Sequence, residues 1–343
     1  MTARDIAPTD TQYFELGDFE LQSGEVLRGA RLAYKALGHL RADRRNAVLF
    51  PTYYTGTHRD NAKLVRPGRA LDPADWFVVI PNLFGNGVSS SPSNHPTQGG
   101  ANFPRLTLLD NVRAQQRLLT EQYGIGRVAL ALGWSMGAQQ AYHHAALFPE
   151  RVERLLAVCG SARTAPHNWV FLEGVKAALQ ADPAFADGHY SAPPLRGLDA
   201  FGRVYAGWAY SQAFFRNHEY RALGYASPGA LLDAWALDHR AWDANDLLCM
   251  LHSWQSADIS DNPRYERNFE RALGSISARA IIMPANNDLY FHPDDSRLEV
   301  AQLPRAELRI IESTWGHIAG GPDREPRASS LIDGAIRALL GTE

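Results

Sequence analysis

The first half of the chain alternates between short apolar runs and segments with helical periodicity. Apolar runs without polar alternation are found at residues 47–50, 76–80, 127–133 and 152–160. Such runs are typical of strands that are covered on both faces of a largely parallel sheet. Residues 107–123 carry apolar positions at helical spacing, and Thr107 to Asp110 forms a capping-box-like start. This alternation predicts a doubly wound α/β fold.

The chain before this region predicts an antiparallel edge. Residues 13–16, 19–21 and 30–34 are short strand-like runs. A turn is expected at Gly17 and Asp18, and residues 23–25 form a polar break before the next strand.

The second half begins with a different pattern. Residues 161–275 are helical and rich in aromatic side chains, and this stretch is too long for a simple connection. We therefore expect a core domain formed by residues 1–160 and 276–343, with residues 161–275 inserted as a helical cap. The aromatic residues could form the cap's own core, a subunit contact or a wall of the substrate site, and the pattern leaves these alternatives open.

The pattern of the core resumes near residue 280. Residues 280–284 and 306–311 predict the last two strands, with a polar helix after His292 between them. A closing helix is expected through residues 331–339.

Composition narrows the class of protein. The 343 residues are 45% hydrophobic and 21% charged, with a formal net charge of −3, so nothing predicts a nucleic-acid partner. The two cysteines imply no disulfide framework. The sequence contains no run of about 18 apolar residues and no signal-peptide core at the N-terminus. We expect a soluble cytoplasmic protein with no membrane partner.

One motif brings chemistry into this framework. Gly133-Trp134-Ser135-Met136-Gly137 joins an apolar strand to an alanine-rich helix. A G-x-S-x-G sequence in this position is typical of a nucleophile elbow, which exposes the serine hydroxyl at the sheet edge. The alternative is a small-residue turn that only packs a helix on a strand. The strand and helix on either side favour the catalytic interpretation.

An acid and a base follow the serine in the expected order. Asp288 follows the penultimate predicted strand and His317 follows the last one, 29 residues later. This order matches a serine, acid and histidine triad on an α/β-hydrolase sheet. Asp294 and Asp295 are alternative acids, although helix capping explains them. The other histidines, such as the neighbouring pair His143 and His144, are expected to be structural.

The same chemistry requires donors for an oxyanion. The backbone N–H of Met136 is the first candidate, because it directly follows the serine. The second donor should come from the loop after the first parallel strand, where Tyr54 is best placed and Tyr53 is next. No metal-binding pattern is found, and a serine triad requires neither a metal nor a cofactor.

With these residues in place, the chain resembles the homoserine O-acetyltransferase-like branch of the α/β-hydrolase superfamily. The matching segments are residues 47–56, 77–93, 134–140, 159–162, 287–290 and 316–317. The resemblance implies a mostly parallel eight-stranded sheet with helices on both faces and a helical cap. It also implies an acyl-enzyme on the serine, an active-site tunnel under the cap, and a possible homodimer formed through the cap.

Three positions depart from the homoserine-acylating members. Those members typically have Gly before the serine and Gly-Gly after the methionine, where this chain has Trp134 and Gly137-Ala138. They also carry an aspartate directly after the catalytic histidine, where it binds the substrate amine. This chain has Ile318, which cannot bind an ammonium group.

Three further residues are candidates for substrate binding. Arg203, seven residues before Tyr210, resembles the family's carboxylate-binding arginine, with a surface ion pair as the alternative. Trp134 and Tyr210 complete the expected substrate-binding set.

The sequence therefore predicts a serine hydrolase that cleaves an ester or amide of a small molecule. The alternative is an acyltransferase that moves an acyl group from acyl-CoA to a hydroxyl acceptor by the same acyl-enzyme. A ligand receptor or scaffold with this fold is a third possibility, which the intact serine, acid and histidine disfavour.

Overall fold

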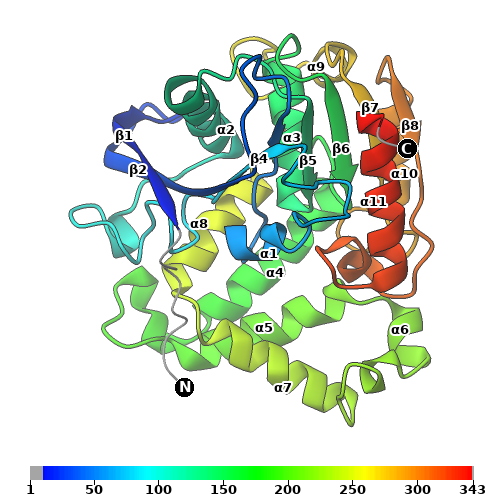
Figure 1. Ribbon diagram of the computed structural model, residues 1–343. Coiled ribbons are helices and arrows are strands. Elements are labelled where there is room, and N and C mark those ends of the chain that lie inside the picture. Colours follow the sequence, from blue (N-terminus) through cyan, green and yellow to red (C-terminus); the bar gives the residue numbers. More distant parts are fainter. Residues whose placement is uncertain (1–10, 342–343) are drawn as a thin grey trace.

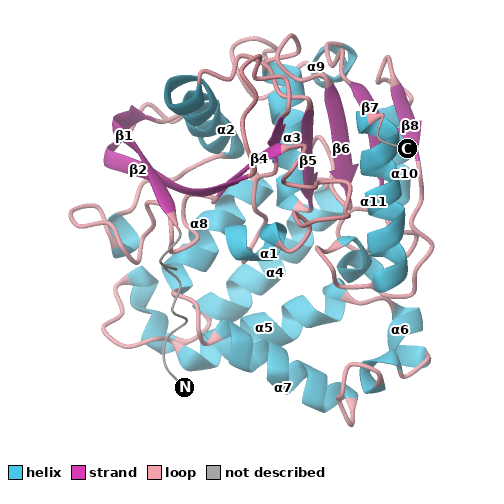
Figure 2. Ribbon diagram, viewed as in Figure 1, coloured by secondary structure: helices cyan, strands magenta, loops and turns pink. Residues whose placement is uncertain are grey.

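A computed structural model describes residues 11–341, and its centre is an eight-stranded sheet (Figures 1 and 2). The strands are β1 (Gln12–Glu20), β2 (Val26–Leu37), β3 (Ala47–Leu49), β4 (Phe77–Pro81), β5 (Leu130–Trp134), β6 (Arg154–Val158), β7 (Arg279–Met283) and β8 (Ala306–Leu308). Their order is β1-β2-β4-β3-β5-β6-β7-β8. The pairs β1–β2 and β2–β4 are antiparallel and the others are parallel. The predicted mostly parallel sheet is confirmed.

The antiparallel edge corrects one prediction. Gly17 and Asp18 do not form a turn, because β1 runs through them with a shift in register on either side of Gly17. Gly17 has a φ of +68°, which glycine adopts in a β-bulge as readily as in a turn. The chain reverses instead at residues 21–25, where Leu21 N–H donates to the Glu25 carbonyl.

Helices cover both faces of the sheet. The core helices are α1 (His58–Ala62), α2 (Leu108–Arg117), α3 (Met136–Leu147), α9 (Phe269–Gly274), α10 (Pro293–Val300) and α11 (Pro326–Leu340). Leu130 and Leu132 of β5 pack in a hydrophobic cluster with α11, whereas Ala131 points to the cluster that contains α2 and α3. This period of two places a hydrophobic core on each face of the sheet.

The predicted start of the helix at residue 107 is confirmed. The Thr107 side chain accepts the Asp110 N–H and the Asp110 carboxylate accepts the Thr107 N–H, which is the capping box. The predicted helix is not uniform, because α2 ends at Arg117 and residues 118–122 form a π-helical turn.

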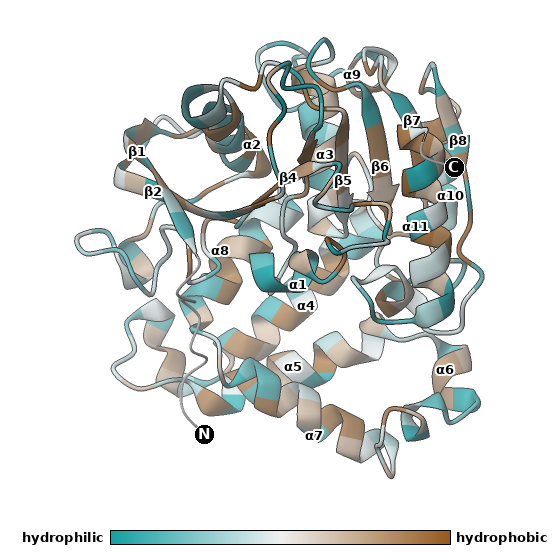
Figure 3. Cartoon of the chain, in the orientation of Figure 1, coloured by the Kyte–Doolittle hydropathy of each residue, from teal (hydrophilic) through white to brown (hydrophobic). Residues whose placement is uncertain are grey.

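A helical layer lies beyond the carboxyl ends of the parallel strands (Figure 1). Its helices are α4 (Pro166–Gln180), α5 (Leu195–Ala209), α6 (Gln212–Arg216), α7 (Pro228–His239) and α8 (Ala244–Gln255). Short 3-10 turns occur at Gly100–Asn102, Pro183–Gly188, Glu219–Arg221 and Gly316–Gly320. Strand β6 becomes apolar as it approaches this layer, from the partly exposed Arg154 to the buried Val158 (Figure 3). The apolar strand ends are thereby covered by helices.

The inserted segment is less uniform than the pattern of residues 161–275 suggested. Helix α9 lies at the end of the strands opposite α5 and α7 (Figure 1). Tyr265, Ala272 and Leu273 belong to the hydrophobic cluster of the sheet, and the Tyr265 hydroxyl donates to the Ala146 carbonyl at the end of α3. The end of the segment thus packs with the residues of the sheet, which the helical pattern alone did not reveal.

Within residues 11–341, no helix combines the length and the apolar character that crossing a membrane requires.

A buried acid in the core gives a testable pH dependence. Glu299 of α10 accepts the Ala162 N–H at 2.8 Å, and burial raises its pKa from 4.5 to about 8. Between these values the folded protein binds one more proton than the unfolded chain, so the free energy of unfolding falls as the pH rises from 5 to 8. The loss is on the order of 4 kcal/mol. We expect Glu299→Gln to reduce this slope in urea unfolding between pH 5 and 9 and to leave the part due to Asp246, whose pKa burial also raises to about 8.

The exposed Glu307 on β8 offers a matched control, because its carboxylate pairs with Arg309 at the surface. Glu307→Gln should leave the slope of the wild-type protein unchanged. Parallel pH profiles for the wild type and Glu299→Gln would show that Glu299 does not cause the slope.

Candidate active site

The G-x-S-x-G motif forms a sharp turn between β5 and α3. Ser135 has φ +57° and ψ −128°, a conformation that is unfavourable for a residue with a side chain. Its N–H donates to the Val158 carbonyl at 3.0 Å, which ties the turn to the neighbouring strand. The structure therefore has the strand, strained turn and helix of a nucleophile elbow.

The two glycines of the motif are required by close backbone contacts. A Cβ on Gly133 would lie 2.1 Å from the Gly137 carbonyl carbon, and a Cβ on Gly137 would lie 2.7 Å from the Pro51 carbonyl oxygen. Neither distance leaves room for a side chain, because the obstructing atoms are backbone atoms. The motif is thus a packing requirement of this turn.

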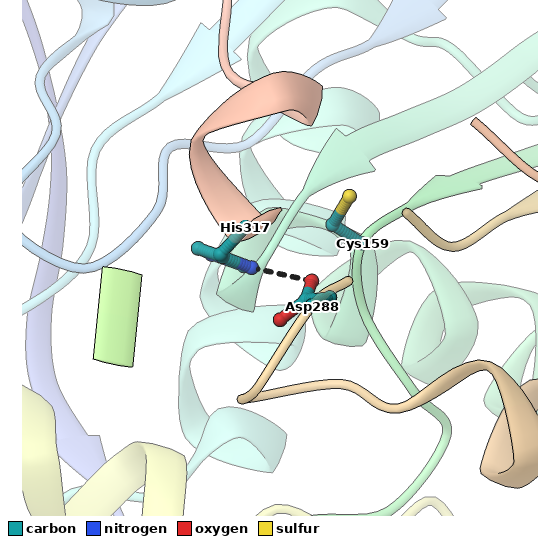
Figure 4. Close-up of side chains that lie close together, drawn as sticks. All are labelled: Cys159, Asp288 and His317. Carbon is teal, nitrogen blue, oxygen red and sulfur yellow. Dashed lines mark hydrogen bonds and ion pairs between the residues drawn. The ribbon is translucent and has the colours of Figure 1, made fainter. Parts of the chain in front are cut away.

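Asp288 and His317 form a buried pair (Figure 4). His317 Nδ1 donates to Asp288 Oδ2 at 2.8 Å, and the exposed fractions of the two side chains are 3% and 0%. Asp288 Oδ1 accepts the N–H groups of Tyr290 and Phe291 at 2.8 and 3.1 Å. A carboxylate beside Nδ1 fixes the tautomer in which Nε2 is free to accept a proton.

The chain segments after β7 and β8 bring this pair together. Asp288 lies in the loop that follows β7, and His317 lies in the 3-10 turn Gly316–Gly320 after β8. Gly316 has a φ of +62°, and a Cβ there would lie 2.9 Å from the Ser211 nitrogen of the helical layer. A glycine is needed at position 316, where the segment that carries His317 passes close to the helical layer.

Ser135 and His317 line one cavity of about 360 Å³ under the helical layer. Its lining residues are Tyr53, Tyr54, Thr55, Asp60, Trp134, Ser135, Tyr205, Ala209, Tyr210, Tyr225, Ala234, Trp235, Asp238, His239, Tyr290, His317, Ile318 and Arg324. Among residues 11–341, no hydrogen bond joins Ser135 to His317. Such catalytic contacts are often long without substrate and shorten when it binds.

Two backbone N–H groups are available beside the serine. Met136 begins α3, so its N–H has no partner within the helix. Tyr54 lies in the loop after β3 and lines the cavity with Ser135. In the part of the chain that the structure describes, neither N–H donates to another protein group. An oxyanion hole requires N–H groups of this kind, which have no acceptor in the protein.

Four of the phenol groups that line the cavity are buried, and their burial favours the neutral form. Burial raises the pKa of Tyr210 to about 12, and it raises the pKa values of Tyr54, Tyr205 and Tyr290 well above the ordinary value. The Tyr54 hydroxyl donates to the Leu247 carbonyl at 3.2 Å. These phenols give the cavity aromatic surface beside the charged side chains of Asp60, Asp238 and Arg324.

The predicted substrate-binding residues have different locations. Trp134 and Tyr210 line the cavity with Ser135. Arg203 does not, because its half-exposed side chain forms an ion pair with Asp233 on the surface between α5 and α7. The structure thus places Arg203 in the surface ion pair that the sequence left as the alternative to carboxylate binding.

Cys159 lies beside Asp288 and His317, and its surroundings favour the protonated thiol. Its Sγ is within 4.8 Å of the ligand atoms of Asp288 and His317, and all three side chains are buried (Figure 4). Burial raises the pKa of the thiol well above its ordinary value. A metal would require the thiolate form, which this environment disfavours.

The alternative acids and bases lie elsewhere. Asp294 is in the first turn of α10, where it pairs with the exposed Arg297, and Asp295 follows it. His143 and His144 are buried in α3, and burial lowers the pKa of His144 to about 3. These positions fit the structural roles that the sequence suggested for them.

Sequence reasoning missed several lining residues. Tyr205 of α5, Trp235 of α7 and Arg324 before α11 all border the cavity. Arg324 is exposed and had no signal in the sequence. Tyr290 belongs to the matching segment 287–290. Its position two residues after Asp288 was the only feature of the sequence that indicated a place in the site.

Comparisons with known proteins agree with this geometry. Residues 46–321 match the family described as alpha/beta hydrolase fold. An ethyl acetate hydrolase of Pseudomonas veronii is 36% identical, and the alignment covers 90% of this chain and 89% of that enzyme. A homoserine O-acetyltransferase of Nostoc punctiforme is 28% identical, with 93% and 94% covered.

A solved structure extends the comparison to the fold. The acetyl esterase MekB has a TM-score of 0.94 to this chain at 34% identity, with 98% of both chains covered. The shared sequence and structure show an enzyme of the esterase or acyltransferase type. The chain belongs to the α/β-hydrolase fold family and is similar to its homoserine O-acetyltransferase-like branch.

Proposed function

We propose that this enzyme hydrolyses short-chain carboxylic esters, acetate esters in particular, by means of Ser135, His317 and Asp288. The observation that carries the proposal is that the strained Ser135 turn and His317, which is paired with the buried Asp288, line one cavity. These groups supply the nucleophile, the base and the acid of an acyl-transfer site.

The proposed reaction begins with proton transfer from Ser135 Oγ to His317 Nε2. Oγ forms a bond to the ester carbonyl carbon, and the N–H groups of Met136 and Tyr54 stabilise the resulting oxyanion. The bond to the alcohol oxygen breaks, and His317 returns the proton to that oxygen. Water, deprotonated by His317, then forms a bond to the acyl carbon. The bond from that carbon to Ser135 Oγ breaks, and His317 returns the proton to Oγ, which releases the carboxylic acid and regenerates Ser135.

The size and lining of the cavity support a small ester. Its volume of about 360 Å³ is at the low end of the range of about 300–1,000 Å³ for small-molecule sites. Ile318 presents an apolar side chain next to His317. The names of the relatives, an ethyl acetate hydrolase and an acetyl esterase, agree with this substrate class.

A series of esters tests the proposal. We expect kcat/KM to be highest for acetate esters and to fall at least about tenfold for hexanoate esters of the same alcohol, because the longer chain exceeds the aromatic cavity. The measurement is titration of the released acid under matched conditions. Hexanoate turnover as efficient as acetate turnover would contradict a short acyl site.

Acyl transfer to an alcohol is the alternative, favoured by the homoserine O-acetyltransferase relative. The same acyl-enzyme would then react with a hydroxyl acceptor in place of water. Slow hydrolysis of acetate esters, together with rapid transfer from acetyl-CoA to homoserine, would establish this alternative. The apolar Ile318 supports hydrolysis, because it provides no charge for an amino-acid acceptor.

The core and cap boundaries, the cytoplasmic location and a homodimer formed through the cap stay predictions. Exposed apolar side chains on the helical layer, such as Trp169 and Val170 of α4, agree with a contact there.

A further inference from the structure

Trp134 contacts both the ring and the backbone of His317. The indole and imidazole rings are stacked, with centroids 4.9 Å apart and an interplanar angle of 26°. Trp134 Nε1 also donates to the His317 backbone carbonyl at 3.2 Å. One side chain thereby contacts the histidine at two points, the ring and the backbone carbonyl.

The histidine needs this support because its bond to Asp288 fixes only one ring atom. A ring held by Nδ1 alone can tilt about that hydrogen bond and move Nε2. Tyr290 meets the imidazole edge-on at 4.7 Å, and Phe291 lies 5.6 Å away at 33°. Together with the stacked indole, these rings restrict the tilt from several directions.

The residues around the Trp134 indole pack closely against it. A Cβ on Gly320 would lie 2.9 Å from Trp134 Cδ1, and a Cβ on Gly321 would lie 3.2 Å from Cη2. The Tyr53 ring packs edge-on against the indole at 4.4 Å. With only 7% of Trp134 exposed, the side chain has little freedom to leave the histidine.

We propose that Trp134 is a positioning residue for His317. Its indole face holds the imidazole plane so that Nε2 is directed toward Ser135, and it favours the imidazolium that forms during proton transfer through a cation–π contact. This inference rests on the proposed function, because it assigns Trp134 to the base of that reaction. It differs from the substrate-binding role predicted from the sequence.

The kinetic test compares two substitutions of Trp134. Trp134→Leu removes the aromatic face, so we expect kcat for an acetate ester to fall about 100-fold, as for a base displaced by about 1 Å. KM should change by less than about threefold. Trp134→Phe keeps one ring face but loses the N–H and the second ring of the indole, so it should restore kcat to within about tenfold of wild type.

Trp235 provides a matched control in the same cavity. Its ring contacts Tyr205, Tyr210 and His239 and makes no ring contact with His317 among the described residues. Trp235→Leu should therefore alter KM more than kcat. If Trp134→Leu changes KM and leaves kcat intact, or if the Phe and Leu variants lose kcat equally, the positioning role is overturned.

A spectroscopic readout separates this inference from the proposed function. A stacked imidazolium quenches indole fluorescence. Subtracting the emission spectrum of Trp134→Phe from that of wild type isolates the emission of Trp134, and this emission should fall when acid protonates His317. His317→Gln should abolish that change. Absence of the change would overturn the stacking role whatever the activity, whereas its presence without Ser135-dependent ester hydrolysis would overturn only the proposed function.

Discussion

Ser135→Ala is expected to lower kcat/KM for an acetate ester by about 10⁵-fold, because the substitution removes the nucleophile and makes the acyl-enzyme impossible. The strained backbone and the close glycine contacts remain, since both are independent of the hydroxyl group. The midpoint of thermal unfolding should therefore stay near that of wild type. Residual activity would come from binding and oxyanion stabilisation alone.

Ser161→Ala is the matched control for this loss. Ser161 is also buried, and its hydroxyl donates to the Arg163 carbonyl outside the cavity. We expect kcat/KM within about threefold of wild type, from the loss of one hydrogen bond. If Ser135→Ala kept more than about 1% of the activity, Ser135 would not be the nucleophile.

Asp288→Asn should lower kcat by about 10⁴-fold without unfolding the protein. The asparagine carbonyl oxygen can still accept the N–H groups of Tyr290 and Phe291. Its amide group would then face His317 Nδ1 and force that nitrogen to accept a hydrogen bond. Nε2 would carry the proton, so the histidine could not deprotonate Ser135.

The measurement for Asp288→Asn is kcat together with the thermal midpoint, with Asp294→Asn as its control. Asp294 is exposed at the start of α10 and pairs with Arg297, so its replacement should leave kcat within about twofold. An equal loss in both variants, or full activity in Asp288→Asn, would show that the acid has been assigned to the wrong residue.

The candidate serine, acid and base could be predicted from the sequence because each lies in the segment that follows a parallel strand. A short apolar run predicts a strand, and the carboxyl ends of parallel strands meet at one edge of the sheet. Ser135, Asp288 and His317 therefore come together for reasons that are local in the sequence. The buried pair formed by His317 and Asp288 is the direct result.

The residues of the helical layer that face the cavity could not be predicted in the same way. Arg203 and Tyr205 both lie on α5, about 200° apart around the helix. Tyr205 therefore lines the cavity while Arg203 pairs with Asp233 on the surface. The packing of α5 against α4 and α7 decides which side faces inward, and a single helical sequence does not contain that information.

Local ambiguity explains the remaining differences. Gly17 has a positive φ, which suits both a turn and a bulge, so only pairing with β2 decides between them. Helix α9 has an ordinary helical sequence, and its place beside the sheet follows from long-range contacts such as that of Tyr265 with Ala146.

The most direct test of the account is mass spectrometry of the intact protein after a rapid acid quench during turnover of p-nitrophenyl acetate. Wild type should carry one acetyl group, mapped to Ser135 by peptide fragmentation, and the group should disappear in water as the substrate is exhausted. Ser135→Ala should carry none. Turnover by wild type with the acetyl group on another residue would contradict Ser135 as the nucleophile, and an acetyl-enzyme that persists until an alcohol is added would contradict hydrolysis.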